Sequence, residues 1–178
     1  MRLFTRRDRL SVRELTIFSL LGSIMFITKF VMQWIPNVHL LALFIAAFTL
    51  TYRAKALIPL YVYILLDGVV SGFSMWWAPY LYIWFPLWLV FMLAGKVKMP
   101  QKIKVPFYML LCGLHGLSFG IMYAPAQAFM FGLNFKSMIA WIVAGLPFDL
   151  IHGVSDFFAA SLILPLHSLL VRLEKQSF

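Results

Sequence analysis

The chain has little charge for its length. Only 12% of its 178 residues are charged, with 6 acidic residues against 15 lysines and arginines, while 63% are hydrophobic. Soluble domains carry about 25% charged residues, so no long segment here has the composition of a soluble domain. The basic residues stand in short clusters between apolar runs, not along one face. We therefore expect no nucleic-acid partner.

Cysteine and catalytic motifs are almost absent. Cys112 is the only cysteine, which excludes an intrachain disulfide and a thiolate metal site. The chain has no nucleotide-phosphate loop, no Gly-x-Ser-x-Gly and no His-Glu-x-x-His. We expect no enzymatic activity and no cofactor, and any transport would need a separate source of energy. The arginine-rich start has no small-residue cleavage site after it, so we expect the first apolar run to be retained.

Long apolar runs make up most of the sequence, and in hydrocarbon such runs form helices because every backbone group needs an internal hydrogen bond. We predict an all-α membrane protein, a six-transmembrane-helix bundle that forms one domain over residues 1–178. The expected spans are approximately 15–34, 38–50, 56–72, 80–95, 106–124 and 146–171. An external connection is expected over 125–137, and Pro147 and Pro165 are expected to divide the last stretch into a re-entrant or peripheral entry and a true helix. Five or seven helices are the rival counts, because spans two and four are short.

The orientation follows from the basic residues, which are retained on the cytoplasmic side. With six spans, 13 of the 15 lysines and arginines fall on one side: five before the first span, two after the second, four after the fourth and two in the tail. Both termini are therefore expected in the cytoplasm of a prokaryotic cell, with the chain a multi-pass protein of the cell membrane.

Aromatic residues gather at the other, outer side. The candidates for binding a ligand are Trp76, Trp77, Tyr80, Trp84 and Tyr123. Tryptophan and tyrosine also form interfacial belts in membrane proteins, but a belt has aromatics at both faces. The segment 76–80 is predicted to form a lid or wall that stacks on a flat ligand.

Ionisable residues within spans are costly in lipid and are candidates for a site. Asp67 and Lys29 lie at similar depth in the third and first spans and are predicted to pair. Asn37 and His39 follow Pro36 at the outer end of the first span. They either cap the second helix or donate to a ligand.

A second polar group lies in the last two spans. His115 comes from the fifth, and Asp149, His152 and Asp156 are spaced three and four apart, so these three share one helix face. This spacing is compatible with metal ligation, but side chains of these types inside a bundle more often hydrogen-bond one another. We expect no metal here.

Small residues four apart allow close helix packing. Gly68 with Gly72, and Gly116 with Gly120 and Ala124, are expected to pack inside the bundle. Ser19 and Ser23 form a similar strip on the cytoplasmic half of the first span, where an external partner can contact it.

Four segments together resemble a known family. They are the basic N-terminus running into 15–23, the junction Pro36-Asn37-Val38-His39-Leu40, the pair Asp67-Gly68 and the closing segment 145–153. The chain resembles the substrate-binding S component of energy-coupling factor (ECF) transporters, ABC importers of vitamins in prokaryotes.

This resemblance implies a six-helix bundle that captures a vitamin or precursor from outside. It implies docking on a transmembrane coupling subunit that is driven by two ATPase subunits. The family docks through two alanines four apart in the first helix, and the matching positions here are Ser19 and Ser23. The implied ligand-facing segments are the first junction, the 76–80 loop and the 125–137 loop.

The substrate and two rivals stay open at this point. Cobalamin, a large corrinoid, suits an aromatic and mostly uncharged binding-site entrance. Pantothenate is an anion and needs Lys29, Lys136 or a histidine at the pocket to pair with its carboxylate. One rival is a TspO-type tetrapyrrole-binding protein, with five spans and termini on opposite sides. The other is an intramembrane enzyme that uses His115, Asp149, His152 and Asp156.

Overall fold

The computed structural model describes residues 10–176, so the arginines at 2, 6, 7 and 9 lie outside the described residues. Its helices are α1 (Val12–Met32), α2 (Leu41–Tyr52), the 3-10 turn η2 (Arg53–Ala56), α3 (Leu57–Ser71), α4 (Tyr80–Ala94), α5 (Gln101–Leu117), α6 (Phe119–Phe131), α7 (Phe135–Ala159), the 3-10 turn η3 (Ala160–Leu162) and α8 (Ile163–Gln176). Over this range the predicted all-helical class is confirmed.

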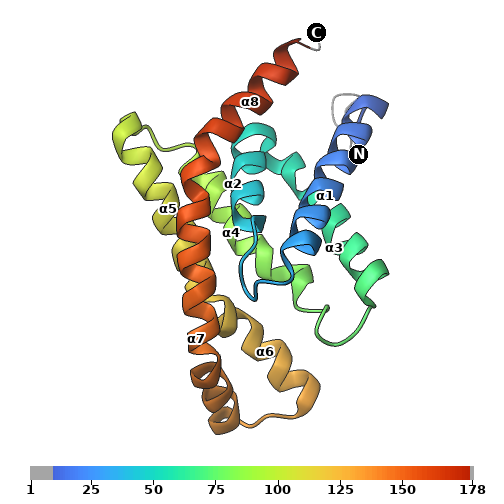
Figure 1. The fold of residues 1–178 in the computed structure, drawn as a ribbon, viewed down its shortest axis with the longest axis vertical. Helices are drawn as coiled ribbons and strands as arrows, with labels where there is room; N and C mark the ends of the chain where they lie inside the picture. Colours follow the sequence, from blue (N-terminus) through green and yellow to red (C-terminus); the bar gives the residue numbers. More distant parts are fainter. Residues whose placement is uncertain (1–9, 177–178) are drawn as a thin grey trace, which may run out of the picture.

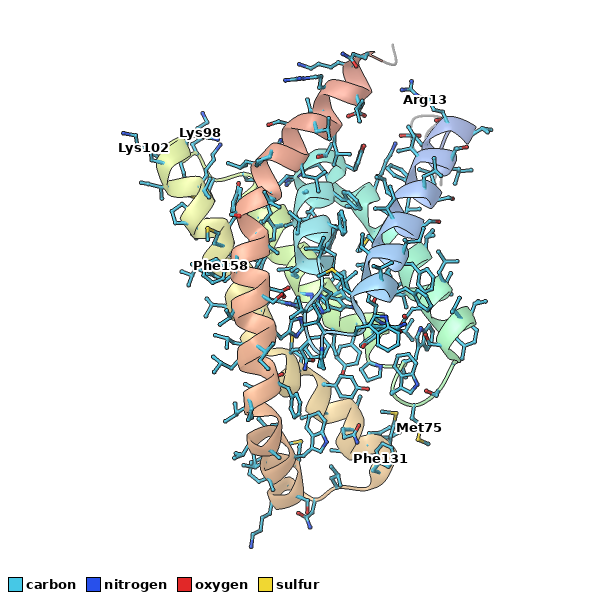
Figure 2. The ribbon with its side chains drawn as sticks, viewed as in Figure 1. Arg13, Met75, Lys98, Lys102, Phe131 and Phe158 are labelled. Carbon is cyan, nitrogen blue, oxygen red and sulfur yellow. The ribbon has the colours of Figure 1, made fainter. Side chains whose placement is uncertain are left out.

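Four helical stretches are long and apolar enough to cross a membrane. They are Val12–Met32, Leu41–Ser71, Gln101–Phe131 and Phe135–Gln176, and α4 is a shorter apolar helix. Many of their large side chains point outward, as Phe158 does from α7 with 64% of its surface exposed (Figure 2). An apolar exterior of this kind is expected of a protein surrounded by lipid.

The two ends of the bundle differ in character. The start of α1, the end of α8, η2 and the α4–α5 connection lie at one end, while α6 and the α3–α4 connection lie at the other (Figure 1). Arg13, Lys98 and Lys102 stand at the first end, and Met75 and Phe131 at the second (Figure 2). The described basic clusters are therefore separated from the aromatic connections along the length of the bundle.

Helix α2 forms the centre of the bundle. Nine consecutive residues, from Leu41 to Thr49, are buried, and α2 packs against both α4 and α8. A helix that is apolar all round is expected to be enclosed on every side. This position explains how a helix of only 12 residues is accommodated.

The reversal between α2 and α3 is fixed by side chains at η2. Arg53 has a positive φ of 56°, and its guanidinium donates to the carbonyl of Met92 at 2.5 Å. Lys55 pairs with Glu14 at 2.5 Å, and Glu14 in turn belongs to a capping box with Ser11 that starts α1. The turn is thus tied to both α4 and α1.

Helices α5 and α7 pack closely through glycines. A Cβ atom built on Gly116 would lie 2.8 Å from the Cα of Gly153 and 3.0 Å from the backbone carbon of His152. Small residues let two helix backbones approach in this way. The predicted internal packing of Gly116 is confirmed.

The predicted boundaries of the fifth helix, 106–124, are wrong. Helix α5 stops at Leu117, and the amide of Ser118 donates to the carbonyls of Leu114 and His115. A separate helix, α6, then runs through Pro125 to Phe131. The chain changes direction at Ser118, so α6 leaves the axis of α5 (Figure 1).

The predicted long connection over 125–137 is also wrong, because only 132–134 separate α6 from α7. Gly132 ends α6 in the left-handed region with a φ of 64°, as a C-terminal glycine commonly does. Asn134 caps α7 by accepting from the amide of Ser137 at 2.9 Å.

Pro147 and Pro165 do not divide the last stretch as predicted. Helix α7 is 25 residues long in all and runs through Pro147 without a break. A proline removes a single backbone hydrogen bond, and packing against the neighbouring helices supports the remainder of the helix. Pro165 lies in the first turn of α8, where its missing N–H is tolerated. The irregularity lies between them, at η3.

We predict that Gly116→Ala destabilises the bundle by about 1–3 kcal/mol, since the added methyl meets backbone atoms that cannot move aside. Thermal unfolding in detergent, followed by size-exclusion fluorescence, measures the loss. Gly145→Ala in α7 is the control, because its Cβ would meet nothing within 4 Å. Equal melting temperatures for the two variants would contradict the packing described.

Candidate functional site

Seven buried residues hold side-chain nitrogen or oxygen atoms that make no hydrogen bond. Within the described chain there are nine such atoms, and they belong to His39, Tyr63, Asp67, Trp84, His115, His152 and Asp156. We call these seven residues the buried polar cluster. Each unpaired buried group costs about 1–3 kcal/mol, so a concentration of them points to a functional site.

Trp84 stands in the middle of the cluster. It is 1% exposed, and its ring lies 5.8 Å from that of His39, 5.6 Å from His115 and 5.6 Å from Phe119. Tyr80, one turn earlier on α4, lies 6.1 Å from it. The connection after α1 and helices α4, α5 and α6 thus meet around one indole ring.

His39, His152 and Asp156 lie close together within the cluster. The Nε2 atom of His152 lies 3.3 Å from Oδ2 of Asp156, and Nδ1 of His39 lies 3.9 Å from Oδ1 of the same carboxylate. The two imidazole rings meet edge to face with centroids 4.6 Å apart. The exposed fractions of the three side chains are 14%, 2% and 0%.

Lys29 and Asp67 form the predicted ion pair, with 2.7 Å between Nζ and Oδ1. The ammonium group also lies 5.9, 5.8 and 5.1 Å from the ring centres of Tyr63, Trp76 and Tyr80. An ammonium at these distances gains cation–π attraction. Tyr80 touches both Lys29 and Trp84, so it joins the ion pair to the rest of the cluster.

Aromatic side chains also hold the α3–α4 connection and α4 against α6. The hydroxyl of Tyr123 on α6 donates to the carbonyl of Trp76 at 2.6 Å, and Tyr82 on α4 donates to the carbonyl of Met122 at 2.8 Å. The α3–α4 connection is thereby held against α6. Trp77 instead donates from Nε1 to the carbonyl of Ile64 at 2.8 Å, so it fixes the connection to α3.

Asp149 lies apart from the unpaired groups. Both its carboxylate oxygens accept from the amide of Gly120, at 3.1 and 3.2 Å. The first amides of a helix have no partner within it and favour a negative charge. Asp149 therefore stabilises the start of α6.

His39 and Asn37 do not cap α2. Its N-cap is Leu40, without a side-chain hydrogen bond. His39 points to α7, and Asn37 adopts a positive φ of 59° in the turn between α1 and α2, a conformation that asparagine tolerates. Of the two alternatives for this junction, capping is therefore excluded.

Nε2 of His115 donates to the carbonyl of Ile83 at 3.0 Å, while its Nδ1 is one of the unpaired atoms. Tyr63 and Phe119 belong to the site but were not among the candidate residues from the sequence, whereas Asp156 was a candidate only as a metal ligand or as part of an intramembrane enzyme. Tyr63 stands four residues before Asp67, and this helical i, i+4 spacing was the available signal for it.

The two serines on α1 lie at the periphery. Ser19 is exposed and Ser23 half-buried, and the hydroxyl of Ser23 donates to the carbonyl of Ser19 at 2.9 Å. Gly22 between them faces α3, where a Cβ would meet Val62 at 2.6 Å. The inner face of α1 is thus packed, and its serine strip stays accessible.

No protein-family model, curated protein or solved structure matches the chain.

Proposed function

We propose that the chain is the substrate-capture subunit of an ECF-type ABC importer for a water-soluble vitamin or vitamin precursor. The buried polar cluster carries this proposal. It combines unpaired hydrogen-bonding groups with aromatic walls in the interior of an apolar bundle, and binding sites for small molecules have this composition. Groups on a ligand would satisfy the polar atoms that the protein leaves unpaired.

The chemistry of the cluster favours a substrate that is recognised mainly by stacking and hydrogen bonding. Lys29 is already neutralised by Asp67 at 2.7 Å, so an anion must compete with a buried carboxylate for it. For this reason we rank cobalamin first among the candidates. Pantothenate comes next, and its carboxylate would have to replace Asp67 beside Lys29.

Six spans with both termini in the cytoplasm fit this function. The stretch Leu41–Ser71 reverses direction at η2 (Figure 1), so we count α2 and α3 as separate spans. With α1, α4, α5 together with α6, and α7 together with α8, this makes six. Helix α3 has 15 residues, about 22 Å, which is less than the hydrocarbon thickness of about 30 Å. The bilayer is expected to be thin around it.

The accessible serine strip supports docking on a coupling subunit in the cell membrane, with two ATPases supplying the energy. Only 17% of the apolar window of α1 is buried. Small side chains such as Ser19 and Ser23 let a partner helix approach closely. Helix α1 is therefore the proposed contact.

The topology is tested by single cysteines in a Cys112→Ala background. We expect Ser74→Cys to react with a membrane-impermeant maleimide from outside intact cells, and Lys98→Cys to react only after the cells are opened. A reporter fused to each terminus should report the cytoplasm. Termini on opposite sides would instead support a five-span TspO-type protein.

Vitamin binding is tested with the six tryptophans as the probe. Purified protein titrated with a complete panel of water-soluble vitamins should show saturable fluorescence quenching by one compound. Trp84→Leu should weaken binding by about 10-fold or more, because a stacked aromatic contributes roughly 0.5–1.5 kcal/mol in addition to its buried area. Trp34→Leu is the control, since Trp34 is 85% exposed and should bind as the parent does. No response to any vitamin would overturn the proposal.

Docking is tested by enlarging the serine strip. Ser19→Leu with Ser23→Leu should abolish co-purification with a co-expressed coupling subunit and leave the vitamin dissociation constant unchanged. Ser161→Leu is the matched control. Its hydroxyl also donates to a backbone carbonyl, that of Phe158 at 2.8 Å, but it lies at η3. Undiminished association of the double variant would remove the assignment to α1.

A further inference from the structure

Three potential metal ligands lie close together within the buried polar cluster. His39 comes from the α1–α2 connection, while His152 and Asp156 stand one turn apart on α7. One ligand atom from each residue lies within 4.8 Å of the other two. Two separate parts of the chain thus bring two imidazoles and a carboxylate to one point.

The contacts among these residues do not satisfy their polar atoms. Although Nε2 of His152 is 3.3 Å from Oδ2 of Asp156, neither atom makes a hydrogen bond, and the same holds for Oδ1 of Asp156 and Nδ1 of His39. The 3.3 Å pair is close enough for a hydrogen bond but is not aligned for one, and the pair between His39 and Asp156, at 3.9 Å, is too long for one. Side chains that bind one ion between them have this arrangement: their polar atoms lie near one another but point toward the ion and not toward each other.

We propose that His39, His152 and Asp156 bind one divalent transition-metal ion, with Zn²⁺ as the best match. Imidazole nitrogen and carboxylate oxygen are ligands for this class of metal. Zinc lies about 2.0–2.2 Å from such atoms, which places neighbouring ligand atoms roughly 3.3–3.6 Å apart in a tetrahedral site. Oδ2 of Asp156 lies 3.3 Å from Nε2 of His152, which meets this requirement, and Nδ1 of His39 lies 3.9 Å from the other oxygen, Oδ1. One ligand atom from each residue lies within 4.8 Å of the other two, so the side chains would move slightly closer together around a bound ion.

His115 is outside the ligand set although it belongs to the cluster. Its Nε2 is already 3.0 Å from the carbonyl of Ile83, and its ring stacks on that of Trp84. Asp149 is also excluded, because the amide of Gly120 occupies both its oxygens. The site therefore supplies three protein ligands.

Three ligands leave a coordination position open, as in zinc sites that bind a further molecule. Two neutral imidazoles and one carboxylate leave a divalent ion with one net positive charge in a buried place. An anionic oxygen or a neutral nitrogen from a solute would complete the coordination. This inference concerns the ion alone and does not depend on which solute the chain transports.

Metal content of the tag-free, full-length protein provides the test. After exposure to Zn²⁺ and gel filtration, elemental analysis should find one zinc per chain. Titration with Co²⁺ should produce visible d–d absorption bands that Zn²⁺ abolishes. His39→Ala, His152→Ala and Asp156→Asn should each raise the metal dissociation constant by at least about 100-fold, beyond what loss of an outer-shell partner costs.

His167→Gln is the matched control. Its Nδ1 lies 2.8 Å from the hydroxyl of Thr51, away from the cluster, so this variant should bind as the parent does. The near-isosteric Asp156→Asn decides the assignment if an alanine variant misfolds. Parent protein without bound zinc or cobalt bands would overturn the proposal, as would metal binding that none of the three variants weakens. Protein that binds the ion but no vitamin would support this inference and count against the proposed function.

Discussion

A bundle surrounded by hydrocarbon can satisfy its polar groups only from within the protein. Two buried side chains meet that constraint: the hydroxyl of Thr49 donates to the carbonyl of Ile45 at 2.6 Å within α2, and Asp149 on α7 accepts from the amide of Gly120 on α6. The exceptions in the described chain gather in the buried polar cluster instead of being scattered. The candidate site is therefore located by the buried polar groups that lack a hydrogen-bond partner within the protein.

The packing of α5 on α7 sets the depth of that cluster. Gly116 and Gly153 meet at the contact between the two helices, where a Cβ on Gly116 would lie 2.8 Å from the Cα of Gly153. Each of these glycines directly follows a histidine, His115 and His152. The contact between the glycines therefore also places both imidazoles at the same height along the bundle. Larger residues at either position would separate the helices and move the histidines apart.

Local patterns were sufficient for the helical class and for the pairing of Lys29 with Asp67, because hydropathy and the cost of a lone charge act over short ranges. The predicted boundaries around α6 and α7 are wrong, because a proline does not by itself end a helix that its neighbours support. Inside a supported bundle Pro125 and Pro147 each remove one bond, and Gly132 and Asn134 mark the true boundary. The contact of His39 with His152 could not be predicted, since it joins residues 113 apart through the packing of several helices.

Helix α1 connects the two activities that we propose. It carries Lys29, which pairs with Asp67 of the buried polar cluster, and it carries Ser19 and Ser23 on the accessible strip. Ten residues of helix separate Lys29 from Ser19 by about 15 Å. Phe18, Gly22 and Met25 face the interior, so α1 is held on one side only. A ligand that changes the pairing of Lys29 with Asp67 acts directly on the helix that meets the partner. Because α1 packs mainly on α3, which carries Asp67, the ion pair joins the two helices whose relative position such a ligand would alter.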